Sequence, residues 1–473
     1  EGGLSVAALD AAERPDGAPA AAAARAARTR RLLEGPIGPT LLALAAPNVV
    51  AMLAQAASSI AEGAYAGRLG TVSLAGLALV FPLFMLTQML SAGSMGGAIS
   101  AAVARALGAG QPERAGRIAL AAWLVALGFA GLSALLGVFF GRSLFELIGG
   151  GPGAPVEAAL DYAAVFFPGC FAVWLCHGTL SIVRGTGDMR TPSTVLLLVS
   201  LTSVPLAGAL SLGFGPLPAL GMAGLALGAV VAHAGGAAVA LWLLVSGRVG
   251  LSLGGALGRL RRADFGDILK VGLISSLNAV QTIVTITLMV ALVSRFGEAA
   301  LAGYGLGARL EFLLIPIVFG VGAALVAMVG ANIGAGARAR ALRIAWTGAF
   351  AAAAIVGAIG LVAALAPGLW LGIFLGPEQS AAWAAGAAYF RIVAPFYACF
   401  GIGLALYFAS QGAGRMVWPI IGSCVRMGLA FGIGLALVSG GGWGVEGVFA
   451  GVACGMIGYG LVTALAVRLT GWR

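Results

Sequence analysis

The sequence predicts an all-α polytopic membrane protein with twelve transmembrane helices in two six-helix lobes. Three observations predict this fold class: long apolar segments, an uneven distribution of arginine, and an internal repeat. Of the 473 residues, 60% are hydrophobic and only 9% are charged, whereas a soluble protein of this length carries about 25% charged residues. The 76 glycines also fit a membrane protein, because small side chains let transmembrane helices approach closely.

The apolar segments recur from about residue 40 to the end of the chain, and glycine, proline and charged residues separate them. Each has about 20 residues or more, which is enough to cross a hydrocarbon core about 30 Å thick. The spans are expected at residues 40–66, 72–101, 115–140, 156–183, 190–213, 218–247, 265–294, 299–331, 341–366, 380–410, 416–439 and 446–467.

The basic residues predict the orientation of these spans. With the amino terminus inside, most of the 27 Lys and Arg residues fall in the amino-terminal tail, in inside loops (Arg184 among them) or at the carboxyl terminus. The exceptions are Arg68, Arg142 and Arg295 outside, and Arg309, Arg391 and Arg426 within spans. This positive-inside pattern predicts that both termini are cytoplasmic. The protein is expected in the plasma membrane, such as a bacterial inner membrane. It also accounts for the net charge of +10 without a nucleic-acid partner.

Four parts follow along the chain. Residues 1–36 are rich in Ala, Pro and Arg, contain no continuous apolar segment, and are predicted to be a disordered cytoplasmic tail. Residues 37–248 are predicted to form the amino-terminal lobe, 249–264 a cytoplasmic inter-lobe linker, and 265–473 the carboxyl-terminal lobe. The five cysteines lie in apolar segments without metal-ligand spacing, so they are expected in the core and no metal site is expected.

The second half of the chain repeats the first at a spacing of about 227 residues. The clearest echoes are LAGLALVFPL (74–83) with LAGYGLGARL (301–310), ALGAGQPERAGR (106–117) with NIGAGARARALR (332–343), and RGTGDMRTP (184–192) with QGAGRMVWP (411–419). Each half holds six spans, an even number, so both halves enter the membrane in the same orientation. Parallel repeats of this kind are typical of transporters whose substrate cavity lies between the halves.

Three motifs in the first half of the chain resemble those of a known family. RGTGDMRTP after the fourth span, ALGAG after the second and EGAYAGRLG at the end of the first resemble the multidrug and toxic compound extrusion (MATE) family, over residues 37 to 470. The resemblance implies a V-shaped arrangement of the two lobes and a secondary active antiporter that works by alternating access. It implies export of small amphiphilic organic compounds, such as drugs and toxins, in exchange for H⁺ or Na⁺. It further implies a monomer among membrane lipids, with no cofactor beyond the coupling ion.

Only two acids, Glu62 and Glu311, lie well inside the expected spans. Because a buried carboxylate is costly, an intramembrane acid is a candidate functional residue. Gln55, Ser58 and Glu62 form one polar stripe at helical spacing. Glu62 is interpreted either as a helix-end carboxylate that reaches the outer interface or as the coupling carboxylate. The resemblance favours coupling, since the family commonly places an aspartate there, and it also makes Pro47 a candidate hinge in the first helix.

The coupling ion is inferred from the oxygens around Glu62. The repeat continues the polar stripe in the second half as Asn278, Gln281, Thr282 and Thr285, but it places Met289 at the position equivalent to Glu62. By resemblance, the acids of the sodium-coupled branch in the seventh and tenth spans are absent, and the fifth-span polar pair of the proton-coupled branch is replaced by Ser203 and Ala207. One carboxylate with a serine is a thin set of ligands for sodium, whereas a lone carboxylate can take up and release a proton. We therefore expect proton coupling, with sodium as the alternative.

Charged and aromatic residues are candidates for the substrate cavity. Glu311 is expected either to pair with an arginine inside the carboxyl-terminal lobe or, with Arg309, Arg391 and Arg426, to leave positive potential for an anionic substrate group. By resemblance, the second and eighth spans line the central cleft. This makes cavity candidates of Phe81, Phe84, Met85, Met89, Phe312 and Phe319, which otherwise face lipid or the core. His177 and His233 are interpreted as hydrogen-bonded core residues or as a proton relay.

Other protein classes explain the sequence less well. An intramembrane enzyme needs convergent nucleophiles, bases or metal ligands, and the sequence shows none. A flippase for lipid-linked or other anionic amphiphilic substrates is the main alternative. The RGTGDMRTP stretch itself is predicted to be a cytoplasmic turn, in which glycines end one helix and a proline starts the next, with a local Asp188–Arg pair and no chemistry of its own.

Overall fold

In the computed structural model, residues 18–149, 151–214, 218–253, 259–376 and 379–472 are described, and within these ranges every regular element is helical. Twelve spans are long and apolar enough to cross a membrane, as predicted. In the first half they are α3 (Ile37–Leu69), α4 (Thr71–Gln88) continued by α5 (Gly96–Gly108), α6 (Pro112–Gly149), α7 (Ala154–Gly185), α8 (Arg190–Leu212) and α9 (Gly221–Val245). In the second half they are α10 (Arg262–Val293), α11 (Glu298–Gly334), α12 (Arg338–Leu365), α14 (Ser380–Val393) continued by α15 (Tyr397–Ala413), α16 (Val417–Ser439) and α17 (Val445–Thr470).

Short elements connect some of these helices. The π-helical segment η1 (Met89–Met95) joins α4 to α5, and the 3₁₀ turns η3 (Ser294–Phe296) and η4 (Ala394–Phe396) follow α10 and α14. Helix α13 (Gly368–Leu371) precedes α14. Several helices run beyond the predicted spans, as α6 does past Arg142, because a helix continues into the polar interface where a hydropathy window stops.

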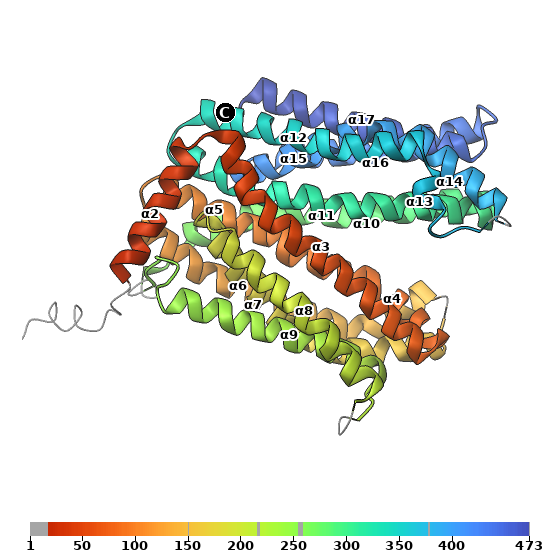
Figure 1. Cartoon of the computed structure of the whole chain (residues 1–473), viewed down its shortest axis with the longest axis horizontal. Coiled ribbons are helices and arrows are strands. Elements are labelled where there is room, and N and C mark those ends of the chain that lie inside the picture. Colours follow the sequence, from red (N-terminus) through yellow and green to blue (C-terminus); the bar gives the residue numbers. More distant parts are fainter. Residues whose placement is uncertain (1–17, 150, 215–217, 254–258, 377–378, 473) are drawn as a thin grey trace, which may run out of the picture.

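The helices form two lobes, which we call the N lobe (α3–α9) and the C lobe (α10–α17). The lobes lie close together at the end of the molecule that carries helix α2 (Ala18–Glu34), which we call the α2 end, and they diverge toward the opposite, far end (Figure 1). This is the predicted V-shaped architecture. Large apolar side chains such as Phe139 and Leu465 are 71% and 52% exposed, as expected for surfaces that contact lipid tails.

The first helix of each lobe crosses to the other lobe at the α2 end. Leu41 and Leu44 of α3 belong to the core of the C lobe, whereas Ile268 and Val271 of α10 belong to the core of the N lobe. The remainder of α3 runs away toward the far end of the N lobe (Figure 1). The core of each lobe therefore includes part of a helix from the other half of the chain. The predicted lobe boundaries at residues 248 and 265 do not account for this exchange.

The internal repeat is visible in the packing of equivalent helices. Ser193 of α8 donates a hydrogen bond to Asn48 Oδ1 of α3 at 3.0 Å, and Ser423 of α16 donates one to Asn278 Oδ1 of α10. The partners are 145 residues apart in both pairs. Because the second pair lies one helical turn further along both of its helices, the two helix pairs pack in the same relative register.

The predicted disordered tail is wrong for residues 18–34, which form helix α2; residues 1–17 lie outside the described residues. Ala and Arg are strong helix formers, and α2 gains tertiary contacts that composition does not reveal. Leu32 is 3% exposed, and its carbonyl accepts a hydrogen bond from Asn332 Nδ2 of α11 at 3.0 Å. Arg25 donates to the Gly250 carbonyl at 2.6 Å. The predicted linker 249–264 is also shortened, because α10 begins at Arg262, and residues 254–258 lie outside the described ranges.

Candidate functional site

Glu62, the predicted coupling acid, lies near the far end of α3 and is 9% exposed. Among the described residues, its carboxylate takes part in no hydrogen bond and no ion pair. The buried phenol of Tyr162 on α7 lies close enough for the charge of Glu62 to act on it. The structure thus places an isolated acid inside the N lobe, and its role in ion coupling stays a prediction.

The polar residues predicted beside Glu62 group around α8 instead. Ser58 Oγ lies 3.1 Å from the Ala54 carbonyl and 3.3 Å from the Ser200 carbonyl of α8. Ser203 is buried, and its Oγ donates to the same Ser200 carbonyl at 3.1 Å. These contacts bring Ser58 and Ser203 together around one backbone acceptor. Gln55, Ser58 and Ser203 make no hydrogen bond to Glu62 within the part of the chain that the structure describes.

The equivalent stripe in the C lobe is used for helix packing. Gln281 Nε2 donates to Thr285 Oγ1 and to the Ser423 carbonyl of α16, both at 2.9 Å. Thr282 Oγ1 donates to the Asn278 carbonyl at 2.8 Å, and Met289, at the position equivalent to Glu62, is 2% exposed in the C-lobe core. Most of these polar groups already have partners, so substrate binding by them stays a prediction.

Glu311 lies in a tyrosine-rich environment inside the C lobe. Its carboxylate accepts a hydrogen bond from Tyr389 Oη of α14, and the charge of Arg426 on α16 also acts on it. Arg426 stands over the rings of Phe400 and Tyr459, with its guanidinium carbon 5.6 and 5.7 Å from their centroids. No Glu311–Arg salt bridge occurs among the described residues, so the expected direct pair is wrong.

Arg309 and Arg391 do not converge on Glu311. Both side chains are exposed, and the guanidinium of Arg309 lies 5.8 Å from the ring centroid of Phe374. The sequence placed three arginines at similar depth, but it did not reveal which helix face each occupies. Only Arg426 turns into the lobe.

The aromatic and methionine candidates for the substrate cavity differ in how exposed they are. Phe81 and Phe312 are 47% and 44% exposed, respectively, while Phe84 packs on Phe166 with ring centroids 5.2 Å apart. Met85 and Met89 are half-buried, and Met89 is the first residue of the π-helical segment η1. Phe319 packs edge-to-face on Phe408 at 5.3 Å, in the pocket described below.

Pro47 lies inside α3, whose helix continues across it, so the hinge stays a prediction.

The two histidines meet inside the N lobe. Their rings lie edge-to-face with centroids 5.6 Å apart. His177 Nδ1 is 2.9 Å from Ser91 Oγ, and His233 Nδ1 is 2.8 Å from the Ala229 carbonyl. They are thus hydrogen-bonded core residues, as one interpretation expected. Their proximity was not expected, because hydropathy does not show that α7 and α9 turn these faces toward each other.

Arg184 is not the inside-loop residue that the sequence indicated. It lies in the last turn of α7 and is only 4% exposed. Residues 186–189 of RGTGDMRTP form the predicted turn between α7 and α8, in which Gly187 adopts a φ of +82°. Asp188 accepts hydrogen bonds from Thr191 N at 3.1 Å and Thr191 Oγ1 at 2.8 Å instead of pairing with an arginine. The helical spacing of His177, Ser181 and Arg184 was a signal that this face of α7 is polar.

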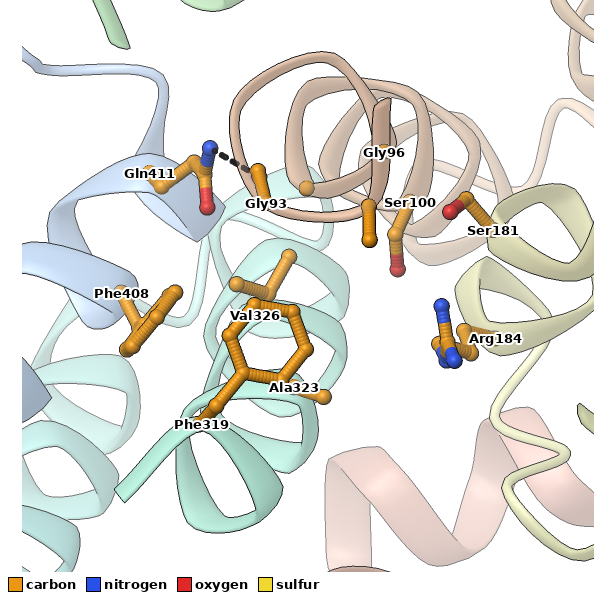
Figure 2. A pocket seen from close by; sticks show the side chains of 12 residues that line it. Gly93, Gly96, Ser100, Ser181, Arg184, Phe319, Ala323, Val326, Phe408 and Gln411 are labelled. Atoms are coloured by element: carbon orange, nitrogen blue, oxygen red, sulfur yellow. Dashed lines mark hydrogen bonds between the residues drawn. The ribbon is translucent and has the colours of Figure 1, made fainter. Parts of the chain in front are cut away.

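Arg184 lines a pocket between the two lobes, the inter-lobe pocket (Figure 2). Arg184, Ser100 and Ser181 of the N lobe lie on one side, and Phe319, Phe408 and Gln411 of the C lobe lie opposite. The pocket has a volume of about 20 Å³. Its other lining residues are Ala92, Gly93, Gly96, Gly97, Ala323 and Val326.

Polar contacts hold the lobes together at the α2 end. Arg114 and Arg117 of α6 form salt bridges with Asp267 and Asp264 of α10, the second at 3.2 Å. Arg105 of α5 donates to the Gly412 carbonyl of α15 at 3.0 Å. The lobes are thus tied to each other at the end where α2 lies.

Comparison with known proteins gives the family. The sequence profile of the MatE family matches residues 47–208 and 275–436, one stretch of equal length in each half. The chain is 30% identical to a probable multidrug resistance protein NorM of Deinococcus radiodurans, over 89% of this chain and 93% of that protein. It is 27% identical to an FAD transporter of Shewanella oneidensis, over 66% of this chain and 68% of that protein.

Solved structures share the fold. A multidrug resistance MATE family transporter in an outward-facing conformation is similar with a TM-score of 0.84, at 24% identity, over 93% of this chain and 97% of that one. A Pyrococcus furiosus transporter of the MOP superfamily is similar with a TM-score of 0.85, at 23% identity, over 97% and 98% of the two chains. With twelve spans, two equivalent halves and a family profile that matches both, this chain belongs to the MatE family of multi-pass membrane transporters.

Proposed function

We propose that the protein exports small amphiphilic organic compounds in exchange for protons, by alternating access between the two lobes. In this proposal Glu62 takes up and releases the coupling proton. The α2 end faces the cytoplasm, and the protein lies in the plasma membrane. The family and the multidrug resistance relatives support drug and toxin extrusion.

The lack of hydrogen-bond and ion-pair partners around Glu62, among the described residues, is the observation that favours proton coupling over sodium coupling. Sodium is a hard cation that needs several oxygen ligands, and the two predicted serine partners, Ser58 and Ser203, direct their hydroxyls at the Ser200 carbonyl instead. No group of three or more His, Cys, Asp or Glu that could hold a metal ion occurs within the described residues. A carboxylate with no fixed partner is suited to exchange a proton with water or with substrate.

The arrangement of the lobes supports alternating access. The salt bridges of α6 with α10 and the hydrogen bond from Arg105 close the α2 end, while the lobes diverge at the far end (Figure 1). With the α2 end in the cytoplasm, this conformation faces outward. Breaking these contacts opens the cytoplasmic side, where an outgoing compound enters.

The cavity surface is proposed to be apolar and aromatic. Met85 and Phe312 occupy equivalent positions in the two halves, and both retain exposed surface. Phe81 adds a second partly exposed ring on α4. Such side chains suit ligands of varied shape, because methionine and aromatic rings adapt without fixed polar partners.

A proteoliposome assay tests the coupling proposal. Purified protein is reconstituted, and efflux of a fluorescent cationic amphiphile is measured across a pH gradient alone and across a sodium gradient alone. We expect transport with the pH gradient and loss of at least about tenfold in Glu62→Gln, because the amide cannot carry the proton. Glu62→Asp should retain part of the activity.

The matched control is Glu113→Gln, an exposed acid in the first turn of α6, which should transport as the unaltered protein does. Full proton-driven activity in Glu62→Gln would contradict the role of Glu62. Transport driven by the sodium gradient, and not by the pH gradient, would contradict proton coupling while leaving export intact.

A second candidate cargo is an anionic amphiphile, including a lipid-linked one. The similarity to an FAD transporter favours including anionic compounds in the assay. Movement of a labelled anionic lipid between leaflets, without efflux of soluble compounds, would identify flipping as the activity.

A further inference from the structure

A buried arginine in the inter-lobe pocket has no partner among the described residues. Arg184 is 4% exposed, and it forms no hydrogen bond or salt bridge with any of them. Its Nε is fully enclosed and lacks an acceptor. A guanidinium is always charged, and taking it out of water is strongly unfavourable unless an anion or several acceptors compensate for the lost hydration.

Two hydroxyls next to Arg184 also lack partners. Ser100 Oγ of α5 and Ser181 Oγ of α7 are buried, and neither has a hydrogen-bond partner within the described chain. Buried hydroxyls are usually hydrogen-bonded. Figure 2 shows both serines on the same side of the pocket as Arg184. The three side chains together offer several unused donors.

The pocket itself supplies no negative charge. Among the described residues, its lining contains no Asp or Glu, and Arg184 is the one charged side chain. The opposite side is formed by Phe319, Phe408 and Val326, which are apolar, and by Gln411. Gln411 Nε2 donates hydrogen bonds to the Gly93 and Ser94 carbonyls, and its Oε1 is a buried neutral acceptor without a partner among the described residues. A compensating anion must therefore come from solution.

The size of the pocket limits that anion. A volume of about 20 Å³ accommodates one particle of the size of a water molecule. A monatomic anion such as chloride, which is slightly larger than a water molecule, is close to this size, whereas an organic carboxylate or a phosphate ester is much larger. Water would accept hydrogen bonds from the three side chains, but it would leave the charge of Arg184 uncompensated.

We propose that Arg184, Ser100 and Ser181 form a binding site for a single small inorganic anion of the size of chloride between the lobes. The guanidinium supplies the charge and the two hydroxyls donate hydrogen bonds to the anion. The apolar side chains of the C lobe close the site. Because the site is completed by both lobes, the anion stabilises the conformation in which the lobes are packed together around it.

The test uses thermal unfolding of the purified full-length protein in lipid nanodiscs. Unfolding is compared in sodium chloride, sodium bromide and sodium gluconate at equal ionic strength, because gluconate is too large for the pocket. We expect the unfolding temperature to be higher by about 2 °C or more in chloride and bromide than in gluconate. Arg184→Gln should remove this difference, while Arg309→Gln, at an exposed arginine of the C lobe, should keep it.

Two further variants keep the proposal testable if Arg184→Gln does not fold. Ser100→Ala and Ser181→Ala should each raise the chloride concentration at half-maximal stabilisation by about fivefold or more. Equal unfolding temperatures in chloride and gluconate for the unaltered protein would overturn the proposal. A chloride effect of unchanged midpoint in both serine variants, or of unchanged size in Arg184→Gln, would overturn it as well. None of these measurements depends on transport activity.

Discussion

Arg184 and Gln411 occupy equivalent positions in the two halves of the chain, and both line the inter-lobe pocket. The two residues therefore share a location in the repeat but differ in their side-chain chemistry. Arg184 leaves its donors unused, whereas Gln411 Nε2 donates across the lobe boundary to the Gly93 and Ser94 carbonyls at 3.2 and 3.1 Å. Both carbonyls belong to the π-helical segment η1, so Gln411 ties the C lobe to an irregular part of the N lobe.

Gln411→Ala should loosen this segment. The change removes two inter-lobe hydrogen bonds, which are worth about 1 kcal/mol each. We expect faster hydrogen–deuterium exchange in Met89–Met95 and a lower unfolding temperature. Gln379→Ala is the control, because the exposed Gln379 side chain accepts a hydrogen bond only from the backbone N of the nearby loop residue Gly376. Unchanged exchange in Met89–Met95 would show that Gln411 does not hold the segment.

Gly108→Ala should prevent close packing of α5 on α11. A methyl group at Gly108 would lie 2.7 Å from the carbonyl carbon of Ala331 and 2.8 Å from its Cα, and backbone atoms cannot move aside cheaply. We expect a destabilisation of about 1–3 kcal/mol, measured by thermal unfolding. Gly128→Ala in α6 meets nothing within 4 Å, so it should be neutral or slightly stabilising. Equal effects of the two substitutions would contradict the close contact.

The two salt bridges at the α2 end should differ in their contributions. The side chain of Asp264 is 1% exposed, and it accepts hydrogen bonds from Arg117 Nε at 3.2 Å and from Arg261 N at 3.0 Å. Asp264→Asn should therefore cost about 3 kcal/mol, as measured by denaturant unfolding.

The comparison variant is Asp267→Asn. The side chains of Asp267 and Arg114 are 34% and 36% exposed, and a pair at this exposure contributes about 0–1 kcal/mol. A larger loss of stability in Asp267→Asn than in Asp264→Asn would contradict this ranking.

Asn332→Ala should release helix α2. Asn332 is fully buried, and its Nδ2 donates to the carbonyls of Leu32 at 3.0 Å and Met328 at 2.8 Å. Without this donor, the Leu32 carbonyl is left buried without its partner, which costs about 1–3 kcal/mol. We expect faster hydrogen exchange throughout Ala18–Glu34. Thr347→Ala, at a half-buried residue whose hydroxyl bonds only within its own helix, should leave exchange in α2 unchanged, and slow exchange in Asn332→Ala would exclude this anchoring.

Much of the fold was predictable because hydropathy and repetition are local properties. The twelve spans follow from apolar length, and the two halves follow from echoes such as RGTGDMRTP with QGAGRMVWP. Helix α2 was missed because its stability depends on the contacts of Leu32 and Arg25 with distant parts of the chain. The crossing of α3 and α10 between the lobes was missed for a similar reason. No local sequence pattern predicts which of the two lobe cores the end of a helix packs into.

The candidate site was predictable only in part. The sequence left open whether Glu62 reaches the outer interface or lies inside the lobe, and the structure places it inside, 9% exposed. Its lack of partners among the described residues depends on how α3 packs against α8. Arg309, Arg391 and Arg426 looked alike in sequence, and only their helix faces separate the two exposed residues from Arg426 near Glu311.

By itself, the sequence determined the number of spans, the two-lobe repeat, the family resemblance and the isolated position of Glu62 along an apolar helix. Only the tertiary structure decided that Arg184 is buried, that Ser100 and Ser181 lie beside it, and that His177 meets His233. The physical reason is that helical periodicity assigns a residue to a face, whereas the partner of that face is set by the packing of helices far apart in the chain.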